Sequence, residues 1–531
     1  MAGQNAADRQ EETVPLAPLP RDYNAAVDLI GRNLAAGRAQ KIAFRDDRGA
    51  YSYAELAERV DRFANLVRGL GIVPEQRILL CLLDGIDFPT AFLGAIKAGV
   101  VPVPINTLLT TADYDFILRD SRARLLVVSP PLLPAFTPII ERHPELQVIV
   151  AGEDSAAYPR LADLMAAAKS EFTAARTSCD DICFWLYSSG STGAPKGTVH
   201  LHSHLIRTAE LYAVPVLRIA EDDIVFSAAK LFFAYGLGNA LTFPLAVGAT
   251  SILMAERPTP VAVSRVLREA RPTIFYGVPT LYGALLASSD LPTRDTLALR
   301  RCVSAGEALP EDIGKRWEAR TGTAILDGIG STEMLHIFLS NRPGELRYGT
   351  TGKPVPGYAV RLVDEAGQPV RPGEIGELQV AGPTSAPLYW NNRERSRSTF
   401  LGEWTRSGDK YIESEDGYFT YCGRTDDMLK VGGIYVAPFE VEGALLSHDA
   451  VLEAAVIGVA DELGLTKAKA FIVVKSGVAA DTALAEALQR HVKERLAPYK
   501  YPRWIEFIAE LPKTATGKIQ RFKLRERAKS P

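Results

Sequence analysis

The chain has 531 residues, of which 47% are hydrophobic and 23% are charged, and its formal net charge is −3. A chain of this length and composition can bury large cores and is expected to divide into at least two domains. The small net charge provides no basic field, which excludes capture of nucleic acid or anionic lipid by bulk electrostatics. The five cysteines form no Cys-x-x-Cys pair and no disulfide framework, so we expect a cytoplasmic protein.

Residues 1–22 are polar and then rich in proline, without the basic and apolar regions of a signal peptide, so they are predicted to form a disordered tail. Elsewhere the longest uncharged apolar runs fall well short of the roughly 18 residues that span a bilayer. We therefore predict no membrane partner.

A layered α/β fold is predicted for most of the chain. Ser52 and Glu55 form a capping-box pattern, followed by apolar residues at helical spacing and then by an apolar run at residues 78–83 that predicts a strand. Residues 91–103 and 261–274 repeat this order of helix and strand. Helices that alternate with apolar strands indicate mostly buried sheets in a large N-terminal domain.

The segment Tyr-Ser-Ser-Gly-Ser-Thr-Gly-Ala-Pro-Lys-Gly occupies residues 187–197. Its glycines allow backbone N–H groups to converge on an anion, beside hydroxyls and the Lys196 cation, which suits phosphate binding. A serine-rich surface turn is the alternative from composition alone. Because Pro195 precedes the lysine and Gly197 follows it, the metal-binding hydroxyl of a Walker loop is missing, which excludes a kinase or GTPase P-loop.

Three histidines, His200, His202 and His204, follow this segment. At strand spacing their side chains would share one face, which is one requirement of a zinc site. No cluster of carboxylates or cysteines accompanies them, so a zinc site is not favoured.

Five further motifs follow in order, at residues 304–307 (Ser-Ala-Gly-Glu), 327–333 (Asp-Gly-Ile-Gly-Ser-Thr-Glu), 407–409 (Ser-Gly-Asp), 423–427 (Gly-Arg-Thr-Asp-Asp) and 512–518 (Pro-Lys-Thr-Ala-Thr-Gly-Lys). Together with residues 187–197 they resemble the signature motifs of the adenylate-forming superfamily. This superfamily comprises acyl-CoA synthetases, luciferases and the adenylation domains of peptide synthetases. The resemblance covers roughly residues 25 to 525, and six motifs in fixed order argue against coincidence.

The resemblance implies a large N-terminal domain at residues 23–425 and a small, mobile α+β domain at residues 426–531, with the hinge at Asp426. The sequence pattern also changes after Gly423, since residues 451–459 and 470–474 read as strands and a helical apolar stripe follows.

The implied chemistry is activation of a carboxylic acid by ATP with Mg²⁺, followed by transfer of the acyl group to coenzyme A. By resemblance Lys518 bridges the carboxylate and the α-phosphate, Thr332 donates to the α-phosphate and Glu333 is the Mg²⁺ ligand. Without the resemblance, Lys518 would read as a solvated lysine near the end of the chain. The implied nucleotide- and coenzyme-binding residues are Ser188, Ser189, Gly190, Ser191, Thr192, Gly193, Lys196, Gly306, Glu307, Asp327, Asp409, Arg424, Gly432 and Gly433. His204 is implied to border the active site.

The acid is indicated by residues 229–239, which hold three aromatic side chains among small ones. Together with Met-Leu-His-Ile at residues 334–337, this stretch resembles bacterial benzoate-CoA ligases. An aromatic core strand is its alternative interpretation, and a hydrogen-bonded core histidine is the alternative for the histidine in the second stretch. By resemblance the aryl site is lined by Ala234, Tyr235, Gly330, His336 and Ile337.

Two details leave the specificity open. Ile329 stands where many relatives have a tyrosine stacked on adenine, so base binding is expected to depend more on shape and on Asp327. Benzoate suits a small apolar pocket, whereas a 4-hydroxyl group needs a buried partner that Tyr235 or His336 would supply. Hydroxybenzoate therefore stays open as a substrate.

Three interpretations of the whole chain follow. The favoured one is a free-standing aryl-CoA ligase, and the second is an enzyme that adenylates an aromatic acid and loads it onto a carrier protein. The third, a catalytically silent nucleotide-binding regulator, is the least favoured because Lys518, Glu333 and Asp409 are all present.

Overall fold

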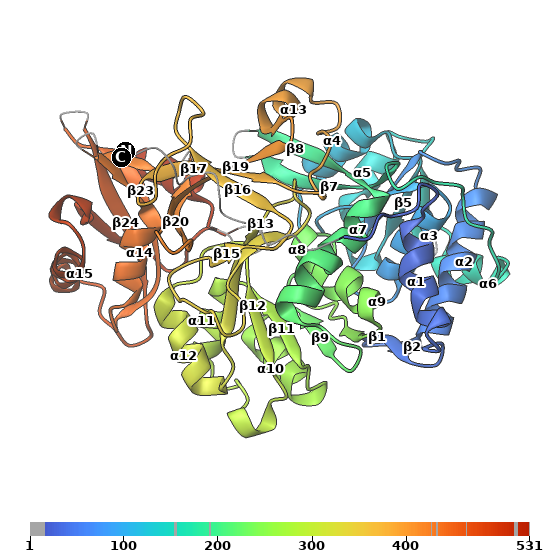
Figure 1. The fold of residues 1–531 in the computed structure, drawn as a ribbon, viewed down its shortest axis with the longest axis horizontal. Coiled ribbons are helices and arrows are strands. Elements are labelled where there is room, and N and C mark those ends of the chain that lie inside the picture. Colours follow the sequence, from blue (N-terminus) through green and yellow to red (C-terminus); the bar gives the residue numbers. More distant parts are fainter. Residues whose placement is uncertain are drawn as a thin grey trace, which may run out of the picture.

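The computed structural model describes residues 16–152, 157–190, 193–425, 427–431, 434–462, 465–513 and 519–529. Figure 1 shows a large body that carries the N-terminal helices at one end and a smaller C-terminal body at the other end. Within the described residues, no helix combines the length and hydrophobicity needed to span a bilayer. The predicted fold class, a large layered α/β part followed by a small α+β part, is confirmed.

The largest sheet among the described residues has nine strands, and its central strands are parallel and buried. Buried parallel strands appear as continuous apolar runs in the sequence, and the predicted order of helix and strand at residues 261–274 is observed as α10 (Pro260–Glu269) followed by a strand that begins at Ile274. In spatial order the strands are β15 (Lys353–Pro354), β14 (Ile337–Ser340), β13 (Ile325–Gly330), β12 (Arg301–Ser304), β11 (Ile274–Gly277), β9 (Ile224–Ser227), β10 (Thr250–Ile252), β1 (Ile42–Asp46) and β2 (Gly49–Ser52).

A second parallel sheet lies in the N-terminal part, with strands in the order β4 (Val101–Pro104), β3 (Arg77–Cys81), β5 (Leu125–Val128) and β6 (Gln147–Val150). The predicted helix before it is confirmed, because Ser52 and Glu55 cap each other at the start of α2 (Tyr53–Gly69). The predicted strand at residues 78–83 is observed as β3 and ends two residues earlier.

An antiparallel hairpin and an antiparallel sheet complete the large body. The hairpin consists of β7 (Ile182–Gly190) and β8 (Gly193–Leu201), so the predicted phosphate segment joins its two strands. The sheet contains β16 (Ala359–Val363), β17 (Ile375–Ala381), β19 (Trp404–Glu413), β18 (Phe400–Leu401) and β20 (Phe419–Arg424).

Helices cover these sheets and share the core with the strands. They are α1 (Ala25–Ala35), α3 (Asp87–Lys97), α4 (Thr111–Ser121), η1 (Pro130–Ala135), α5 (Thr137–Ile140), α6 (Leu161–Ala167), α7 (His202–Thr208), η2 (Ala209–Leu217), α8 (Ala234–Leu237), η3 (Gly238–Thr242), α9 (Phe243–Val247), α10 (Pro260–Glu269), α11 (Pro279–Ala287), η4 (Arg294–Thr296), α12 (Glu311–Thr321) and α13 (Arg393–Thr399). Residues 229–239 therefore lead into helix, and the alternative of an aromatic core strand is wrong.

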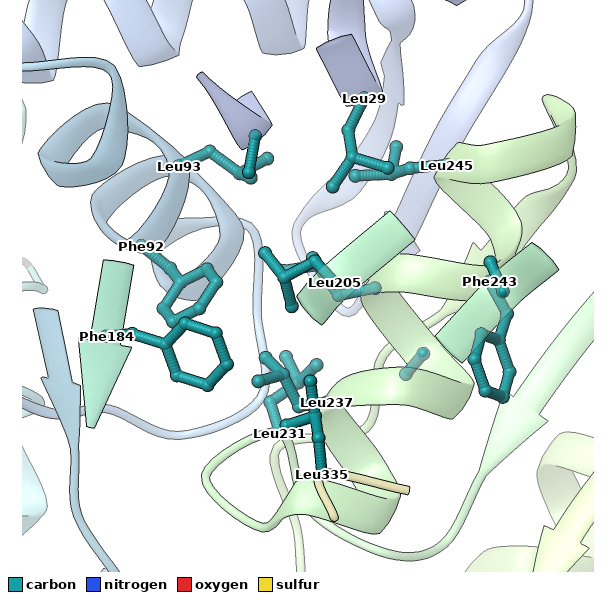
Figure 2. Packing of buried hydrophobic residues seen from close by; sticks show 14 of the residues in the cluster. Leu29, Phe92, Leu93, Phe184, Leu205, Leu231, Leu237, Phe243, Leu245 and Leu335 are labelled. Atoms are coloured by element: carbon teal, nitrogen blue, oxygen red, sulfur yellow. The ribbon is translucent and has the colours of Figure 1, made fainter. Parts of the chain in front are cut away.

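The main core brings the N-terminal helices against the site-bearing segments. Figure 2 shows Phe92 of α3 facing Phe184 of β7, with Leu205 of α7 beside them and Leu335 below. The rings of Phe92 and Phe184 meet edge to face with centroids 5.4 Å apart. Burial of such side chains is worth about 1.5–3 kcal/mol each, so this packing holds β7 and residue 335 rigidly behind the site.

The C-terminal body has its own two hydrophobic cores, which begin at Leu429, whereas the main core ends at Tyr421. Between these positions lies Asp426, the predicted hinge, which falls outside the described residues. The body contains β21 (Leu429–Val431), β22 (Ile434–Val436), α14 (Pro438–Leu446), β23 (Val451–Ala460), β24 (Thr466–Val474), α15 (Thr482–Arg495), η5 (Pro498–Lys500), β25 (Trp504–Phe507) and α16 (Arg521–Lys529).

Residues 16–22 belong to the predicted tail but contact the large body. Arg207 donates a hydrogen bond to the carbonyl oxygen of Ala17 at 2.6 Å, and the backbone N–H of Cys179 donates to Arg21 at 3.0 Å. The packed part of the chain therefore begins earlier than the predicted residue 23, because the prolines of the tail still allow extended backbone to lie along the body.

Candidate active site

A cavity of about 1620 Å³ opens between the large and the small body. Its wall brings together residues from each of the predicted motifs that the structure describes. The predicted nucleotide-site and catalytic residues on this wall are Ser188, Lys196, Gly306, Glu307, Asp327, Thr332, Glu333, Asp409 and Arg424, and the predicted aryl-site residue Gly330 lies there too.

The hairpin of β7 and β8 presents the predicted phosphate segment at one side of this cavity. Gly197 of β8 packs against the ring of Tyr187, where an added Cβ atom would lie 3.1 Å from Cζ, so a larger residue would press on the hairpin. The Tyr187 hydroxyl donates to Asp120 at 2.6 Å and fixes the ring. Ser191 and Thr192 lie outside the described residues, and Ser189, Gly190 and Gly193 are placed by their backbone alone.

Lys196 and Glu333 form a half-buried ion pair inside the cavity. The Lys196 Nζ atom lies 2.9 Å from Glu333 Oε1. Tyr389 completes the group, since its hydroxyl donates to Glu333 Oε1 at 2.6 Å and accepts from Lys196 at 2.8 Å. Burial opposes ionisation of Glu333, but the charge of Lys196 and these hydrogen bonds lower its pKa to about 2. The site thus holds an ionised carboxylate beside a cation.

Thr332 is held from behind by His200. The ring Nε2–H of His200 donates to the Thr332 carbonyl oxygen at 2.8 Å. Burial lowers the pKa of His200 to about 4, so the ring is neutral near pH 7. This contact gives the loop before Glu333 a fixed backbone position.

The three histidines do not share one strand face. The chain turns from β8 into α7 after Leu201, which brings His200 Nδ1 within 3.0 Å of His204 Nδ1. His202 points elsewhere and accepts from the Ala25 N–H at 3.2 Å. The prediction of a common face was wrong because the strand ends between the first and second histidine. Among the described residues no three His, Cys, Asp or Glu side chains gather as metal ligands.

The predicted base and ribose contacts line the same cavity. Asp327 is buried, and its Oδ1 atom has no hydrogen-bond partner among the described residues. Burial raises the pKa of this carboxyl group. Asp409 and Arg424 are paired across β19 and β20, and Arg424 Nη1 donates to Asp409 Oδ1 at 3.1 Å.

The C-terminal body reaches the same wall through Ile519, whose N–H donates to Glu307 Oε1 at 3.3 Å. Ile519 also pairs with Lys513 in an antiparallel bridge, which flanks the segment that contains Lys518. Lys518 itself lies outside the described residues, as do Asp426, Gly432 and Gly433.

The predicted aryl residues gather behind Gly330 and do not, apart from that glycine, line the large cavity. The His336 Nε2–H group points at the Asn239 Oδ1 atom, 3.1 Å away, and at the Tyr235 carbonyl oxygen, 3.3 Å away. The Tyr235 hydroxyl is directed at two backbone carbonyls, Gly277 at 3.3 Å and Val303 at 3.2 Å. Ala234 neighbours this group in α8, and Ile337 pairs with Gly330 across β13 and β14.

Two residues on the cavity wall were missed in the sequence. Tyr389 belongs to no motif. The one feature of the sequence that distinguishes it is that it forms an aromatic pair with the adjacent Trp390. Arg395 in α13 also lines the cavity, but a basic residue in a polar helix is usually interpreted as solvent-exposed.

Comparison with known proteins decides the family. Residues 32–390 match the family model described as AMP-binding enzyme, and residues 440–518 match the model of the AMP-binding enzyme C-terminal domain. The chain belongs to the AMP-binding enzyme family.

The chain is 64% identical over 519 residues to the benzoate-CoA ligase of Thauera aromatica, covering 97% of this chain and 98% of that protein. It is 51% identical over 513 residues to a 4-hydroxybenzoate-CoA/benzoate-CoA ligase of Rhodopseudomonas palustris, covering 95% and 94% of the two chains. Its fold is similar to that of a benzoate-CoA ligase from Burkholderia xenovorans LB400, with a TM-score of 0.90 and 58% identity, covering 95% of this chain and 100% of that one.

Proposed function

We propose that the protein joins benzoate to coenzyme A with ATP, through a benzoyl-adenylate, and releases AMP and pyrophosphate. The observation that carries this proposal is a single cavity that holds the Lys196–Glu333 group, the Asp409–Arg424 pair and Asp327, with the aromatic group of Tyr235 behind it. The similarity to benzoate-CoA ligases over nearly the whole chain supports the choice of acid.

The triphosphate would lie along the hairpin of β7 and β8. Ser188 and the backbone around Gly190 and Gly193 would hold its β- and γ-phosphates, with Lys196 as the nearby cation. Ser189, Ser191 and Thr192 would add hydroxyl donors. Preorganised donors and cations stabilise the negative charge that gathers on the leaving pyrophosphate.

Glu333 fits a magnesium ligand, because it is a half-buried carboxylate on the cavity wall that its neighbours keep ionised. In nucleotide sites Mg²⁺ typically takes one or two carboxylates and completes its shell with phosphate oxygens and water, which agrees with one carboxylate here. When bound, the ion would neutralise charge on the phosphates. Thr332, with its carbonyl fixed by His200, would place its hydroxyl as a donor to the α-phosphate.

The nucleoside is proposed to lie against the cavity residues of the motifs that follow the phosphate hairpin in the chain. Asp409 and Arg424 would bind the ribose hydroxyls, while Gly306 and Glu307 would line the adenine. The Oδ1 atom of Asp327, which has no hydrogen-bond partner in the described part of the chain, fits a hydrogen-bond donor such as the adenine amino group.

Lys518 is proposed to complete the adenylation site from the small domain. Its neighbour Ile519 contacts Glu307 on the cavity wall, which supports a lysine that reaches the reacting carboxylate and α-phosphate. The small domain is proposed to rotate about Asp426 after adenylation, so that Gly432 and Gly433 approach the pantetheine arm of coenzyme A.

For the acid, Ala234, Tyr235, Gly330, His336 and Ile337 are proposed to surround the ring. A 4-hydroxybenzoate ligase is the second candidate, since the relative from Rhodopseudomonas palustris is named for both acids. The hydrogen bonds of Tyr235 and His336 within the protein favour benzoate, because those polar groups already have partners. The free state of all five cysteines supports a cytoplasmic location.

The test is formation of AMP and acyl-CoA with ATP, Mg²⁺ and coenzyme A, supplied with benzoate, 4-hydroxybenzoate, 2-aminobenzoate, acetate or octanoate. Benzoate is expected to give AMP and benzoyl-CoA at the highest kcat/KM. Adenylate without a coenzyme A thioester would instead indicate a carrier-loading enzyme. Absence of turnover with every acid would favour a nucleotide-binding regulator.

A further inference from the structure

Residues 384–390, here called the connecting segment, link the phosphate hairpin to the loop that carries Glu333. At one end the Ala386 N–H donates to the Glu333 carbonyl oxygen at 2.8 Å. At the other end the Trp390 N–H donates to Gly197 at 2.7 Å, and Tyr389 bridges to Thr198 beside β8. The segment therefore fixes two parts of the site that are 137 residues apart in the chain.

Side chains anchor this segment further. The Thr384 hydroxyl donates to the Met334 carbonyl oxygen at 2.8 Å. The Trp390 indole N–H donates to Asp120 at 2.9 Å, and its ring packs on Trp185 with centroids 4.4 Å apart. Tyr389 lies between these two anchors, so its ring has little freedom to move.

The hydroxyl group of Tyr389 has two partners of opposite charge. It donates to Glu333 at 2.6 Å and accepts from Lys196 at 2.8 Å, and Lys196 Nζ also lies 4.3 Å from the centre of the Tyr389 ring. Tyr389 is only 2% exposed. A buried neutral hydroxyl that touches both members of an ion pair keeps a contact with either one when the other leaves.

Binding of a triphosphate would change this arrangement. Phosphate oxygens attract Lys196, and an ionised carboxylate buried without a cation or a donor is costly. The position of Tyr389 is held by backbone contacts as well as by its bond from Lys196: its backbone bridges to Thr198 of β8, and Ala386 of the same segment donates to the Glu333 carbonyl oxygen. It therefore stays beside Glu333 while Lys196 moves.

We propose that Tyr389 is a positioning residue for the magnesium–nucleotide complex: Lys196 neutralises Glu333 until phosphates draw it away, and the Tyr389 hydroxyl then keeps the carboxylate oriented for the metal. The proposal rests on the nucleotide site of the proposed function and does not depend on the identity of the acid.

The experiment compares ATP binding by wild type, Tyr389→Phe and Tyr358→Phe, measured by isothermal titration calorimetry with MgCl₂ and with EDTA, without acid or coenzyme A. Tyr358 is the matched control, because its buried hydroxyl bonds Thr384 at 2.8 Å but does not touch Glu333. In wild type, Mg²⁺ is expected to tighten ATP binding. In Tyr389→Phe this gain is expected to fall about tenfold, the effect of losing one hydrogen bond to a charged group, while the Kd in EDTA stays near the wild-type value.

Three results would overturn the proposal. The first is a wild-type magnesium response in Tyr389→Phe, and the second is an equal weakening of ATP binding with and without Mg²⁺, which indicates a merely structural residue. The third is the same loss in Tyr358→Phe. A wild-type protein that binds magnesium–ATP but forms no benzoyl-CoA would refute the assigned acid and leave this proposal standing.

A second variant tests the role of Lys196 even if Tyr389→Phe does not fold. Lys196→Met leaves Glu333 without its cation, so we expect a lower Tm than wild type, and partial recovery with MgCl₂ alone. Lys315→Met is the control, because Lys315 pairs with Glu311 at the surface, where its side chain is 63% exposed. Equal Tm values for Lys196→Met and wild type, with no response to MgCl₂, would contradict the proposal.

Discussion

Replacing Tyr235 with phenylalanine separates two roles that its hydroxyl group is able to play in the aryl site. In the structure this hydroxyl is directed at the carbonyl oxygens of Gly277 and Val303, at 3.3 and 3.2 Å. Both contacts are long, and the Val303 oxygen also accepts from Tyr282 at 2.9 Å. The loss should therefore lie at the low end of the range for one hydrogen bond, about 0.5–1 kcal/mol of unfolding free energy.

The effect on specificity is the sharper measurement. Because the Tyr235 hydroxyl is already bonded within the protein, we expect Tyr235→Phe to keep the wild-type ratio of kcat/KM for benzoate and 4-hydroxybenzoate to within about threefold. If this hydroxyl were instead the partner of a substrate hydroxyl, its removal would cost about 1–3 kcal/mol, a loss of about 5- to 150-fold in kcat/KM for that acid.

Initial rates of AMP release with each acid give this ratio, and equilibrium unfolding in urea gives the stability. A tenfold loss confined to 4-hydroxybenzoate would refute the reasoning, because it would show that the hydroxyl leaves its backbone partners to bind the substrate. A lower free energy of unfolding in Tyr235→Phe, with the wild-type ratio of kcat/KM for the two acids, would agree with the structure.

Three further predictions test other parts of the molecule. In Gly238→Ala the added Cβ atom would lie 2.3 Å from Cδ2 of His336, so the KM for benzoate should rise about tenfold with little change in the KM for ATP, whereas Gly443→Ala, which has open space, should behave as wild type. Burial lowers the pKa of His202 to about 4. Below about pH 6.5 the unfolded chain therefore binds more protons than the folded chain, so the free energy of unfolding should decrease as the pH is lowered. His202→Gln should remove about 2 kcal/mol of the difference in unfolding free energy between pH 7 and pH 5, and an unchanged difference would contradict this assignment. Lys518→Ala should abolish adenylate formation but spare thioester formation from preformed benzoyl-adenylate. Equal loss of both half-reactions in single-turnover assays would count against a role of Lys518 in adenylation.

The sequence predicted the parts of the fold that depend on local patterns. The capping box at Ser52 began a helix as expected, and the apolar runs became buried parallel strands. The aromatic stretch at residues 229–239 was harder, because the same side chains suit a core strand or a tight helix around a pocket. Its helical form depends on tertiary packing, since Gly236 lies so close to the Lys230 carbonyl oxygen that a Cβ atom there would be 2.1 Å away.

The predicted site residues come from motifs, and motifs predict which residues meet but not how their charges are arranged. The sequence placed Lys196 and Glu333 in one site, with the lysine near phosphate and the glutamate on a metal. The structure shows them bound to each other, which neither motif indicates. An ion pair of this kind follows from burial, because a carboxylate removed from water needs a nearby cation or donor.

Tyr389 marks the limit of motif-based prediction. A tyrosine between Leu388 and Trp390 carries no catalytic signal by itself. Its position is fixed by backbone pairing with β8 and by the hydrogen bond from Ala386 to residue 333, and both contacts join segments far apart in the chain. The relative position of the phosphate hairpin and the Glu333 loop thus depends on a third segment. Variants along residues 384–390 should consequently alter the magnesium response of ATP binding before they alter selection of the acid.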